Sequence, residues 1–333
     1  EVKPENVIIG GNSSLSLMFD YVAQCMYMGA GFTPWSQQGK VKFLCPCPGY
    51  DRHFAICEFL GIEMINIPMT EEGPDMAAIE EAVKDSSVKG MFCVPKYSNP
   101  QGITYSAETV KRIANLDTAA DDFRIIWDNA YCVHDLTDTT DELLNIFDVL
   151  PEKNKNMVVE VASTSKISYP GAGVACIATS VENVKEILKR LTVQAISYDK
   201  VNMLRHVKFF KDVDGIKAHM QLHAKILKPK FDAVIDTLEA DLSGLEIAEW
   251  VNPNGGYFIS LDVTGGSASR VGVLCKEAGV VLTNVGATFP YGKDPSDSNI
   301  RIAPTFPTPE VLSKAVKVLT TSVKLACLEN LCK

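Results

Sequence analysis

Apolar runs that alternate with helical patterns dominate the first 180 residues of this chain. Each run is long enough for one strand, and in the segments between the runs apolar residues recur at helical spacing. Strands that alternate with helices favour an α/β fold with a mostly parallel sheet flanked by helices. The expected strands lie at 7–9, 41–44, 63–67, 89–94, 124–127, 157–161 and 174–178, and the expected helices begin at 13 and span 50–60, 75–84 and 107–116.

The pattern changes after residue 179. We expect helices at 181–191, 215–242 and from 309 to about 328, with short strands at 257–263, 280–282 and 300–303. This order predicts a large domain over residues 1–209 and a smaller α+β C-terminal domain over residues 210–333. Because the chain enters a glycine turn within ten residues of Glu1, we also expect that an N-terminal segment of the large domain is missing.

Composition and charge narrow the function classes. A net charge of −9 without a basic stripe argues against a nucleic-acid partner. No apolar stretch is long enough to span a bilayer, and no signal-peptide pattern is present. The ten cysteines are scattered, and only Cys45 and Cys47 lie close together. This distribution favours a reducing cytoplasmic setting, and it predicts neither a disulfide framework nor a metal site.

A single lysine follows the apolar run 157–161. Three hydroxyl residues, Ser163 to Ser165, lead directly to Lys166, and a Pro-Gly-Ala-Gly turn follows at 170–173. A lysine at the mouth of a buried strand is desolvated, which lowers its pKa and frees its amine as a nucleophile. Taken alone, this lysine is better explained as a solvated loop residue.

Two more polar residues follow earlier buried strands. Asp128 comes directly after the run 124–127, and Asn99 follows the run 89–94. Taken singly, Asn99 is better explained as a turn residue before a proline, and Asp128 is better explained as a helix cap. In a parallel sheet, however, both would lie with Lys166 beyond the carboxyl ends of the strands, where such sheets bind ligands. A nucleophilic lysine and a buried carboxylate are what pyridoxal phosphate (PLP) needs for imine formation and for its ring nitrogen.

A glycine turn, residues 10–14, follows the first strand and opens a helix. Backbone N–H groups and the helix dipole bind phosphate in this arrangement. The turn has neither the lysine of a P-loop nor the full dinucleotide-binding glycine pattern, so a nucleotide site is disfavoured.

Together these stretches resemble the fold-type I PLP enzymes, in the aspartate-aminotransferase-like class and its MocR-type bacterial subgroup. The resemblance covers essentially the whole chain. It implies a homodimer that moves an amino group between an amino acid, aspartate or glutamate, and a 2-oxo acid by a ping-pong mechanism. The matching stretches are 10–14 (GGNSS), 97–102 (YSNPQG), 128–131 (DNAY), 163–166 (STSK), 254–258 (NGGYF) and 299–304 (NIRIAP).

The resemblance also implies a role for each residue. Lys166 would form the imine with PLP and Asp128 would pair with the ring nitrogen, with His53 behind it. Tyr131 would complete the catalytic set, and Arg301 would bind the substrate α-carboxylate through a bidentate fork. The remaining implied contacts are Gly11, Asn12, Ser13, Ser163 and Ser165 in the phosphate region, Tyr50 and Ala130 on the two ring faces, and Asn99 and Tyr131 at the ring hydroxyl oxygen, with Asn99 also near the substrate.

One departure and three alternatives remain open. Many aminotransferases have a phosphate-binding arginine eight residues after the lysine, where this chain has Val174. The same scaffold also carries PLP-dependent C–S lyases, which release ammonia and need no acceptor. A non-catalytic effector domain of a transcription regulator would require a DNA-binding domain upstream. A fragment that binds PLP without turnover is the third alternative.

Overall fold

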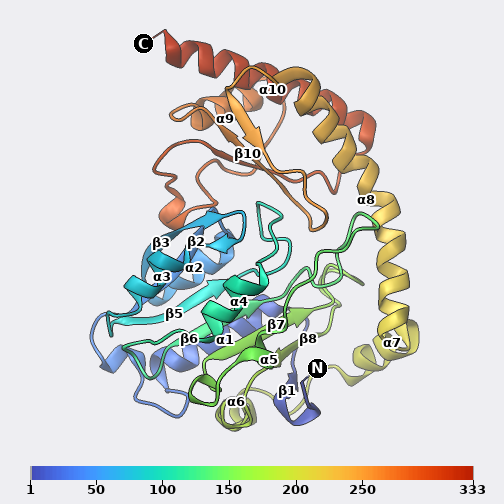
Figure 1. Ribbon diagram of the computed structural model, residues 1–333. Coiled ribbons are helices and arrows are strands. Elements are labelled where there is room, and N and C mark those ends of the chain that lie inside the picture. Colours follow the sequence, from blue (N-terminus) through green and yellow to red (C-terminus); the bar gives the residue numbers. More distant parts are fainter. Residues whose placement is uncertain (1, 333) are drawn as a thin grey trace.

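A computed structural model describes residues 2–332, with an eight-stranded sheet as its largest feature (Figure 1). The strand order is β1-β8-β7-β6-β5-β2-β3-β4. The five strands from β7 to β3 in this order are parallel, whereas β8 runs opposite to β1 and β7, and β4 runs opposite to β3. The sheet is therefore mixed, with a parallel centre. Its strands are β1 (Val7–Ile9), β2 (Lys42–Cys47), β3 (Glu63–Thr70), β4 (Gly73–Pro74), β5 (Val88–Cys93), β6 (Arg124–Asp128), β7 (Val158–Ser163) and β8 (Ala175–Ala178).

Helices cover both faces of this sheet. Successive side chains of a strand point to opposite faces, so Ile126 packs in the core with α1, α2 and α6, while Ile125 and Trp127 pack in the core with α3, α4 and α5. Burial on both faces explains why the central strands read as continuous apolar runs. The helices are α1 (Ser14–Tyr27), α2 (Asp51–Leu60), α3 (Met76–Ala82), α4 (Ala107–Ala114), α5 (Ile146–Val149) and α6 (Val181–Gln194), with 3-10 turns η1 (Pro4–Asn6), η2 (Trp35–Gln37) and η3 (Glu152–Asn154).

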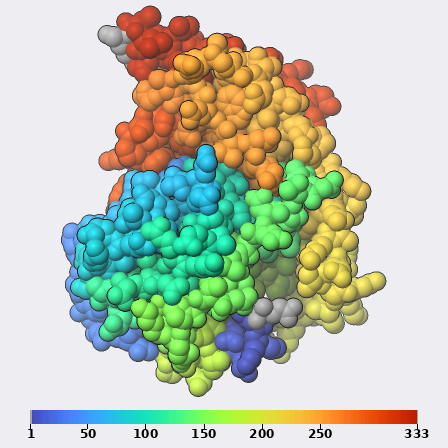
Figure 2. Space-filling view, viewed as in Figure 1, coloured from blue at the N-terminus to red at the C-terminus, as the bar shows by residue number. Residues whose placement is uncertain are grey.

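A smaller antiparallel sheet of order β11-β10-β9 has its own core. The long helix α8 runs along one side of the molecule from α7, beside the large sheet, to this small sheet (Figure 1). Figure 2 shows the orange and red C-terminal part seated on the blue and green part. These elements are α7 (Lys200–Phe210), α8 (Val213–Leu242), β9 (Ala248–Trp250), β10 (Ile259–Val263), α9 (Ala268–Glu277), η4 (Pro290–Gly292), β11 (Asn299–Ile302) and α10 (Pro309–Leu331).

The strand predicted at 280–282 is wrong. Val280 and Leu282 pack against the small-sheet core, and Val281 between them is 84% exposed. The alternation is that of a strand, but the segment pairs with neither edge of the small sheet. Sequence alternation reports which side chains are buried and cannot show whether a partner strand is available. The division into domains at residues 209 and 210 stays a prediction.

Within residues 2–332, no helix combines the length and the apolar character needed to cross a membrane.

Candidate active site

Lys166 lies just beyond the carboxyl end of β7 and is half-buried. Burial lowers the pKa of its amine, and the negative charge of Asp128 opposes this shift. The amine nitrogen Nζ lies 5.1 Å from the centre of the Tyr131 ring. The Tyr257 hydroxyl donates a hydrogen bond of 3.0 Å to the backbone carbonyl of Lys166. The lysine is thus partly desolvated and held from its backbone side.

Asp128 ends β6, the strand next to β7, and is 2% exposed. Its Oδ2 lies 3.0 Å from Nε2 of His53, a residue of α2 whose ring stacks on Phe92 at 4.4 Å. Its other oxygen, Oδ1, is buried without a hydrogen-bond partner. A buried carboxylate oxygen left without a donor is costly. The site therefore fits a ligand that brings one N–H group, such as a protonated pyridine ring.

Asn99 and Arg301 meet at the same end of the sheet. Asn99 follows β5, whereas Arg301 comes from β11 of the small sheet. Arg301 Nη1 donates to Asn99 Oδ1 at 3.2 Å and to Asp51 Oδ1 at 2.9 Å. The guanidinium carbon lies 5.0 Å from the centre of the Phe258 ring. Arg301 Nε is buried without a partner, so one edge of the guanidinium remains available for an anion.

Aromatic residues enclose the space between these groups. Tyr131 and Ala130 are buried directly after β6, and burial raises the pKa of the Tyr131 hydroxyl well above its ordinary value. Tyr50 precedes α2 and contacts the His53 ring edge-on at 5.0 Å. Burial raises the Tyr50 pKa to about 12. Both tyrosines are therefore neutral hydroxyl groups at physiological pH.

The glycine turn and the start of α1 lie beside the loop that carries Lys166. Gly11 has a φ of +65°, a conformation that glycine adopts without strain. Ser13 is the N-cap of α1, but its side chain makes no capping hydrogen bond. Its hydroxyl and the N–H groups of the first helical turn remain available for an anion.

The other predicted phosphate residues mainly join the two loops. Ser163 Oγ donates to Ser165 Oγ at 3.1 Å, and Ser165 Oγ donates to the backbone carbonyl of Asn12 at 2.8 Å. Asn12 Nδ2 donates to the carbonyl of Gly171 at 2.8 Å. In this arrangement the side-chain amide of Asn12 is engaged in holding the loops together. At Val174 the backbone N–H donates to Thr164 Oγ1 at 2.8 Å.

Sequence reasoning missed three neighbours of the site: Asp51, His134 and Tyr257. His134 is 2% exposed and meets the rings of Tyr131 and Tyr257 edge-on, at 5.5 and 5.4 Å. Burial, together with the positive charge of Lys166, lowers the His134 pKa to about 3. His134 has no recognisable motif of its own. Asp51 adjoins Tyr50, and Tyr257 lies in a stretch that the resemblance included without assigning it a role.

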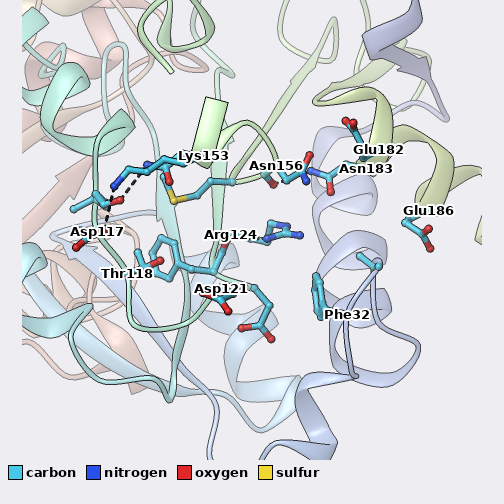
Figure 3. A pocket seen from close by; sticks show the side chains of 17 residues that line it. Phe32, Asp117, Thr118, Asp121, Arg124, Lys153, Asn156, Glu182, Asn183 and Glu186 are labelled. Atoms are coloured by element: carbon cyan, nitrogen blue, oxygen red, sulfur yellow. Dashed lines mark hydrogen bonds and ion pairs between the residues drawn. The ribbon is translucent and has the colours of Figure 1, made fainter. Parts of the chain in front are cut away.

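A separate cavity of about 730 Å³ lies at the amino ends of β6 and β7, opposite the candidate site (Figure 3). Acidic side chains line it, but several already have basic partners. Asp117 pairs with Lys153 at 3.1 Å, and Asp122 pairs with the buried Lys89 at 2.8 Å. Within residues 2–332, the cavity contains none of the predicted site residues.

Comparisons with known proteins give the same class as the fold and the site. A family model described as aspartate amino-transferase matches residues 1–333. The chain is 47% identical over 331 residues to a Mycolicibacterium smegmatis protein named as an aminotransferase, covering 98% of this chain and 77% of that protein. It is 46% identical over 332 residues to an aspartate aminotransferase of Corynebacterium glutamicum, covering 99% and 77%.

Solved structures agree with this. The crystal structure of an aspartate transaminase from Corynebacterium glutamicum superposes with a TM-score of 0.97 at 45% identity, covering 99% of this chain and 78% of that one. An α-aminoadipate aminotransferase from Thermus thermophilus, complexed with N-(5'-phosphopyridoxyl)-L-leucine, shares the fold with a TM-score of 0.81 at 20% identity, covering 98% and 79%.

The chain therefore belongs to the aspartate aminotransferase family. It is an aminotransferase with the α/β fold of the PLP-dependent enzymes, and the family implies PLP as cofactor and amino acids and 2-oxo acids as substrates.

Proposed function

We propose that this protein transfers an amino group between aspartate or glutamate and a 2-oxo acid by a ping-pong mechanism, with PLP held between Lys166 and Asp128. The observation that carries the proposal is the buried, unpartnered Oδ1 of Asp128 beside a half-buried lysine of lowered pKa. The aspartate preference is supported by the printed name of the Corynebacterium glutamicum relative.

PLP, when bound, supplies an aldehyde that condenses with amines and a protonated ring that withdraws electrons. Asp128 would accept the ring N–H at Oδ1 while His53 holds Oδ2, so that the carboxylate keeps its charge and orientation. The lowered pKa of Lys166 provides a neutral amine at a pH where an ordinary lysine is protonated. The same amine can take up the proton from the substrate Cα and, as the ammonium, donate it again.

Arg301 would bind the α-carboxylate of the substrate. Its Nη1 is occupied by Asn99 and Asp51, so the free edge that includes Nε is the one that can form a bidentate pair. The two bonds to Nη1 fix the plane of the guanidinium before the substrate arrives. The remaining proposed contacts are Gly11, Asn12, Ser13, Ser163 and Ser165 around the phosphate, Tyr50 and Ala130 on the ring faces, and Asn99 and Tyr131 at the ring hydroxyl.

Reductive labelling tests the central assignment. Borohydride treatment of the PLP-loaded protein should fix the cofactor on Lys166, as read by peptide mass mapping. Lys166→Ala should lose the label, and Lys153→Ala, a variant at an exposed lysine, should keep it. A label on another lysine of the wild-type protein would overturn the proposal.

A single-turnover experiment separates transfer from the C–S lyase alternative. Mixed with aspartate alone, the loaded protein should convert its cofactor to the amino form without releasing ammonia. Release of ammonia and a keto acid from a sulfur-containing amino acid, with the cofactor unchanged, would favour the lyase.

We also propose that the chain belongs to the MocR-type subgroup, acts in the cytoplasm and forms a homodimer. The subgroup rests on the six matching stretches of sequence. A reducing location is supported by ten cysteines that are all unpaired. Sedimentation velocity of the purified protein checks the dimer.

A further inference from the structure

Four of the five histidines of this chain gather around the lysine loop, which we define as residues 164–168. His206 and His219 make hydrogen bonds to the loop, and His134 lies beside Lys166. His223 touches only the ring of His219 among these groups, with ring centres 4.6 Å apart. The proposed chemistry assigns none of the four a role.

His206 is held by its own helix, α7. Its Nδ1 lies 2.9 Å from the backbone carbonyl of Asn202, one turn earlier. A carbonyl can only accept, so Nδ1 carries the proton. In the neutral ring the other nitrogen, Nε2, is therefore an acceptor, and α7 fixes this tautomer.

Two hydroxyl groups converge on that acceptor. Ser168 Oγ lies 2.7 Å from His206 Nε2, and Thr164 Oγ1 lies 3.0 Å from it. These residues stand two positions after and two positions before Lys166. Thr164 also accepts from the backbone N–H of Val174 at 2.8 Å, and the Ser168 backbone N–H bonds to the Thr164 carbonyl at 2.8 Å. His206 thus closes a single turn of chain with the reactive lysine at its middle.

The opposite side of the turn is held from α8 and from the segment that precedes β10. His219 Nε2 lies 2.9 Å from the carbonyl of Ile167, to which it donates, and Tyr257 donates to the carbonyl of Lys166. Backbone groups on both sides of the lysine side chain are therefore fixed. Its amine can then vary in position only through its own side-chain torsions.

We propose that His206 is a positioning residue for Lys166. Through the acceptor Nε2 it holds the hydroxyls of Thr164 and Ser168, and so it fixes the direction in which the lysine leaves the loop. The inference rests on the proposed function, since it assigns Lys166 as the reacting amine. A displacement of about 1 Å at a reacting group can cost roughly 100-fold in rate, so a loop held in this way affects kcat more than substrate binding.

The test replaces His206 by phenylalanine, which keeps a ring but removes both nitrogens. We expect kcat to fall by about 10- to 100-fold with KM for the amino acid unchanged, and the absorption band of the PLP-loaded protein to titrate at a different pH. In the cofactor-free protein, amide hydrogen exchange at 167 and 168 should speed up by about tenfold or more. His223→Phe is the matched control, because it makes the same change without a hydrogen bond to the loop, and it should match the wild type in all three readouts.

A double-mutant cycle identifies the route of the effect. If His206 acts through the two hydroxyls, combining His206→Phe with Thr164→Val and Ser168→Ala should add little beyond His206→Phe alone. Fully additive losses, or wild-type exchange and spectrum in His206→Phe, would overturn the proposal. If circular dichroism shows that His206→Phe does not fold, the Thr164→Val/Ser168→Ala variant replaces it. That variant must show the same faster amide exchange and the same shifted titration of the absorption band. Wild-type values in that variant would overturn the proposal.

Failure of the proposed function gives a different result. A wild-type protein that forms no adduct at Lys166 would refute the assignment of the reacting amine, while exchange in the cofactor-free variants still reports whether His206 holds the loop. If the wild-type protein is labelled at Lys166 and His206→Phe keeps the wild-type exchange and spectrum, only the positioning role of His206 is refuted.

Discussion

Two charged residues of the candidate site, Asp128 and Arg301, each have one polar atom with a partner and one buried polar atom without one. Asp128 gives one oxygen to His53 and leaves the other without a donor, and Arg301 gives one nitrogen to Asp51 and Asn99 and leaves Nε without an acceptor. A structural ion pair would satisfy both partners, because unpaired buried charge is costly. Groups left incomplete in this way are suited to ligands that bring the missing donor or acceptor.

The reactivity of the Lys166 amine should depend on Asp128. The ordinary lysine pKa is 10.5, burial lowers it here, and the Asp128 charge raises it by favouring the ammonium form. Removing that charge in Asp128→Asn should move the titration of the amine further toward acid. The measurement is the pH dependence of imine formation between pyridoxal and the cofactor-free protein. Glu160→Gln, at a half-buried carboxyl on β7, should titrate as the wild type does, and an upward shift in Asp128→Asn would contradict the prediction.

His134 should make the protein sensitive to acid. Its pKa falls from an ordinary 6.5 to about 3 in the folded state, so between these values the unfolded chain binds a proton that the folded chain does not. Stability from this group is complete above pH 6.5 and falls by about 1.4 kcal/mol per pH unit as the pH drops toward 3.

The variant His134→Phe removes that titration and keeps an apolar ring between Tyr131 and Tyr257. Its unfolding free energy should fall less steeply between about pH 6 and pH 4, with a slope shallower by roughly 1 kcal/mol per unit. Denaturant unfolding at several pH values measures the two slopes. At alkaline pH, where the histidine is neutral in both states, wild type and variant should differ by at most about 1 kcal/mol. Parallel curves would show that His134 is not the titrating group.

The sequence alone was sufficient to predict which polar residues follow strands and lie at one edge of the sheet. Lys166, Asp128 and Asn99 each come after an apolar run, and parallel strands bring such positions to one edge of the sheet. The sequence could not show that Asp51 contacts Arg301 or that His134 packs beside Lys166, because those contacts depend on how helices and loops lie across the sheet. The engagement of the Asn12 amide with Gly171 was likewise unpredictable, since it depends on the distance between two loops.

At the scale of elements, the proposed phosphate site depends on the close approach of two loops, the glycine turn and the lysine loop. A Cβ at Gly173 would lie 3.0 Å from the backbone oxygen of Asn12 and 3.0 Å from the backbone nitrogen of Ser165. Neither backbone atom can move aside as a side chain can. Glycine at this position therefore lets the strand that follows pass between the glycine turn and the lysine loop.

Gly173→Ala should push these loops apart and weaken PLP binding. Overpacking of this kind costs about 1–3 kcal/mol, which corresponds to a loss of roughly tenfold or more in affinity. Titration of the cofactor-free protein with PLP measures it. Gly272→Ala is the control, because its Cβ would meet only a methyl group of Val285, at 3.0 Å in the small-sheet part, and its affinity should equal that of the wild type. Equal affinity in both variants would show that the loops tolerate the separation.

Element types were predictable where burial and hydrogen bonding coincide. The central strands are buried on both faces and paired on both edges, so apolar runs identified them to within a few residues. The segment 280–282 has the burial pattern without the pairing, and the short strand β9 has pairing with little apolar signal. Alternation along the first 180 residues predicted a mostly parallel sheet, and it did not predict the reversed direction of β8, which depends on the short connection through the lysine loop.

At the scale of the whole molecule, the candidate site is complete only where the two sheets meet. Lys166, Asp128 and Asn99 belong to the large sheet, and Arg301 belongs to β11 of the small sheet. The pairing of Arg301 with Asp51 is a contact between the two parts, with side-chain exposures of 9% and 29%. In the proposed function, the position of the substrate carboxylate relative to the lysine is therefore set by how the C-terminal part sits on the rest.

Arg301→Lys tests this arrangement because it keeps the positive charge and loses the planar fork. The lysine ammonium group can still pair with Asp51. The contact between the two parts should therefore persist, and the melting temperature should change little. The half-reaction with aspartate should slow by about 10- to 100-fold in kcat/KM, the worth of one hydrogen bond between charged groups.

Two controls accompany this variant. An amine that lacks a carboxylate should react with variant and wild type at similar rates, because it makes no bidentate pair with the guanidinium. Arg270→Lys, which alters a bidentate pair with Glu329 far from the site, should leave both reactions unchanged. If Arg301→Lys slowed the two amines equally, the arginine would act by holding the small sheet in place, and the substrate carboxylate would have to bind elsewhere.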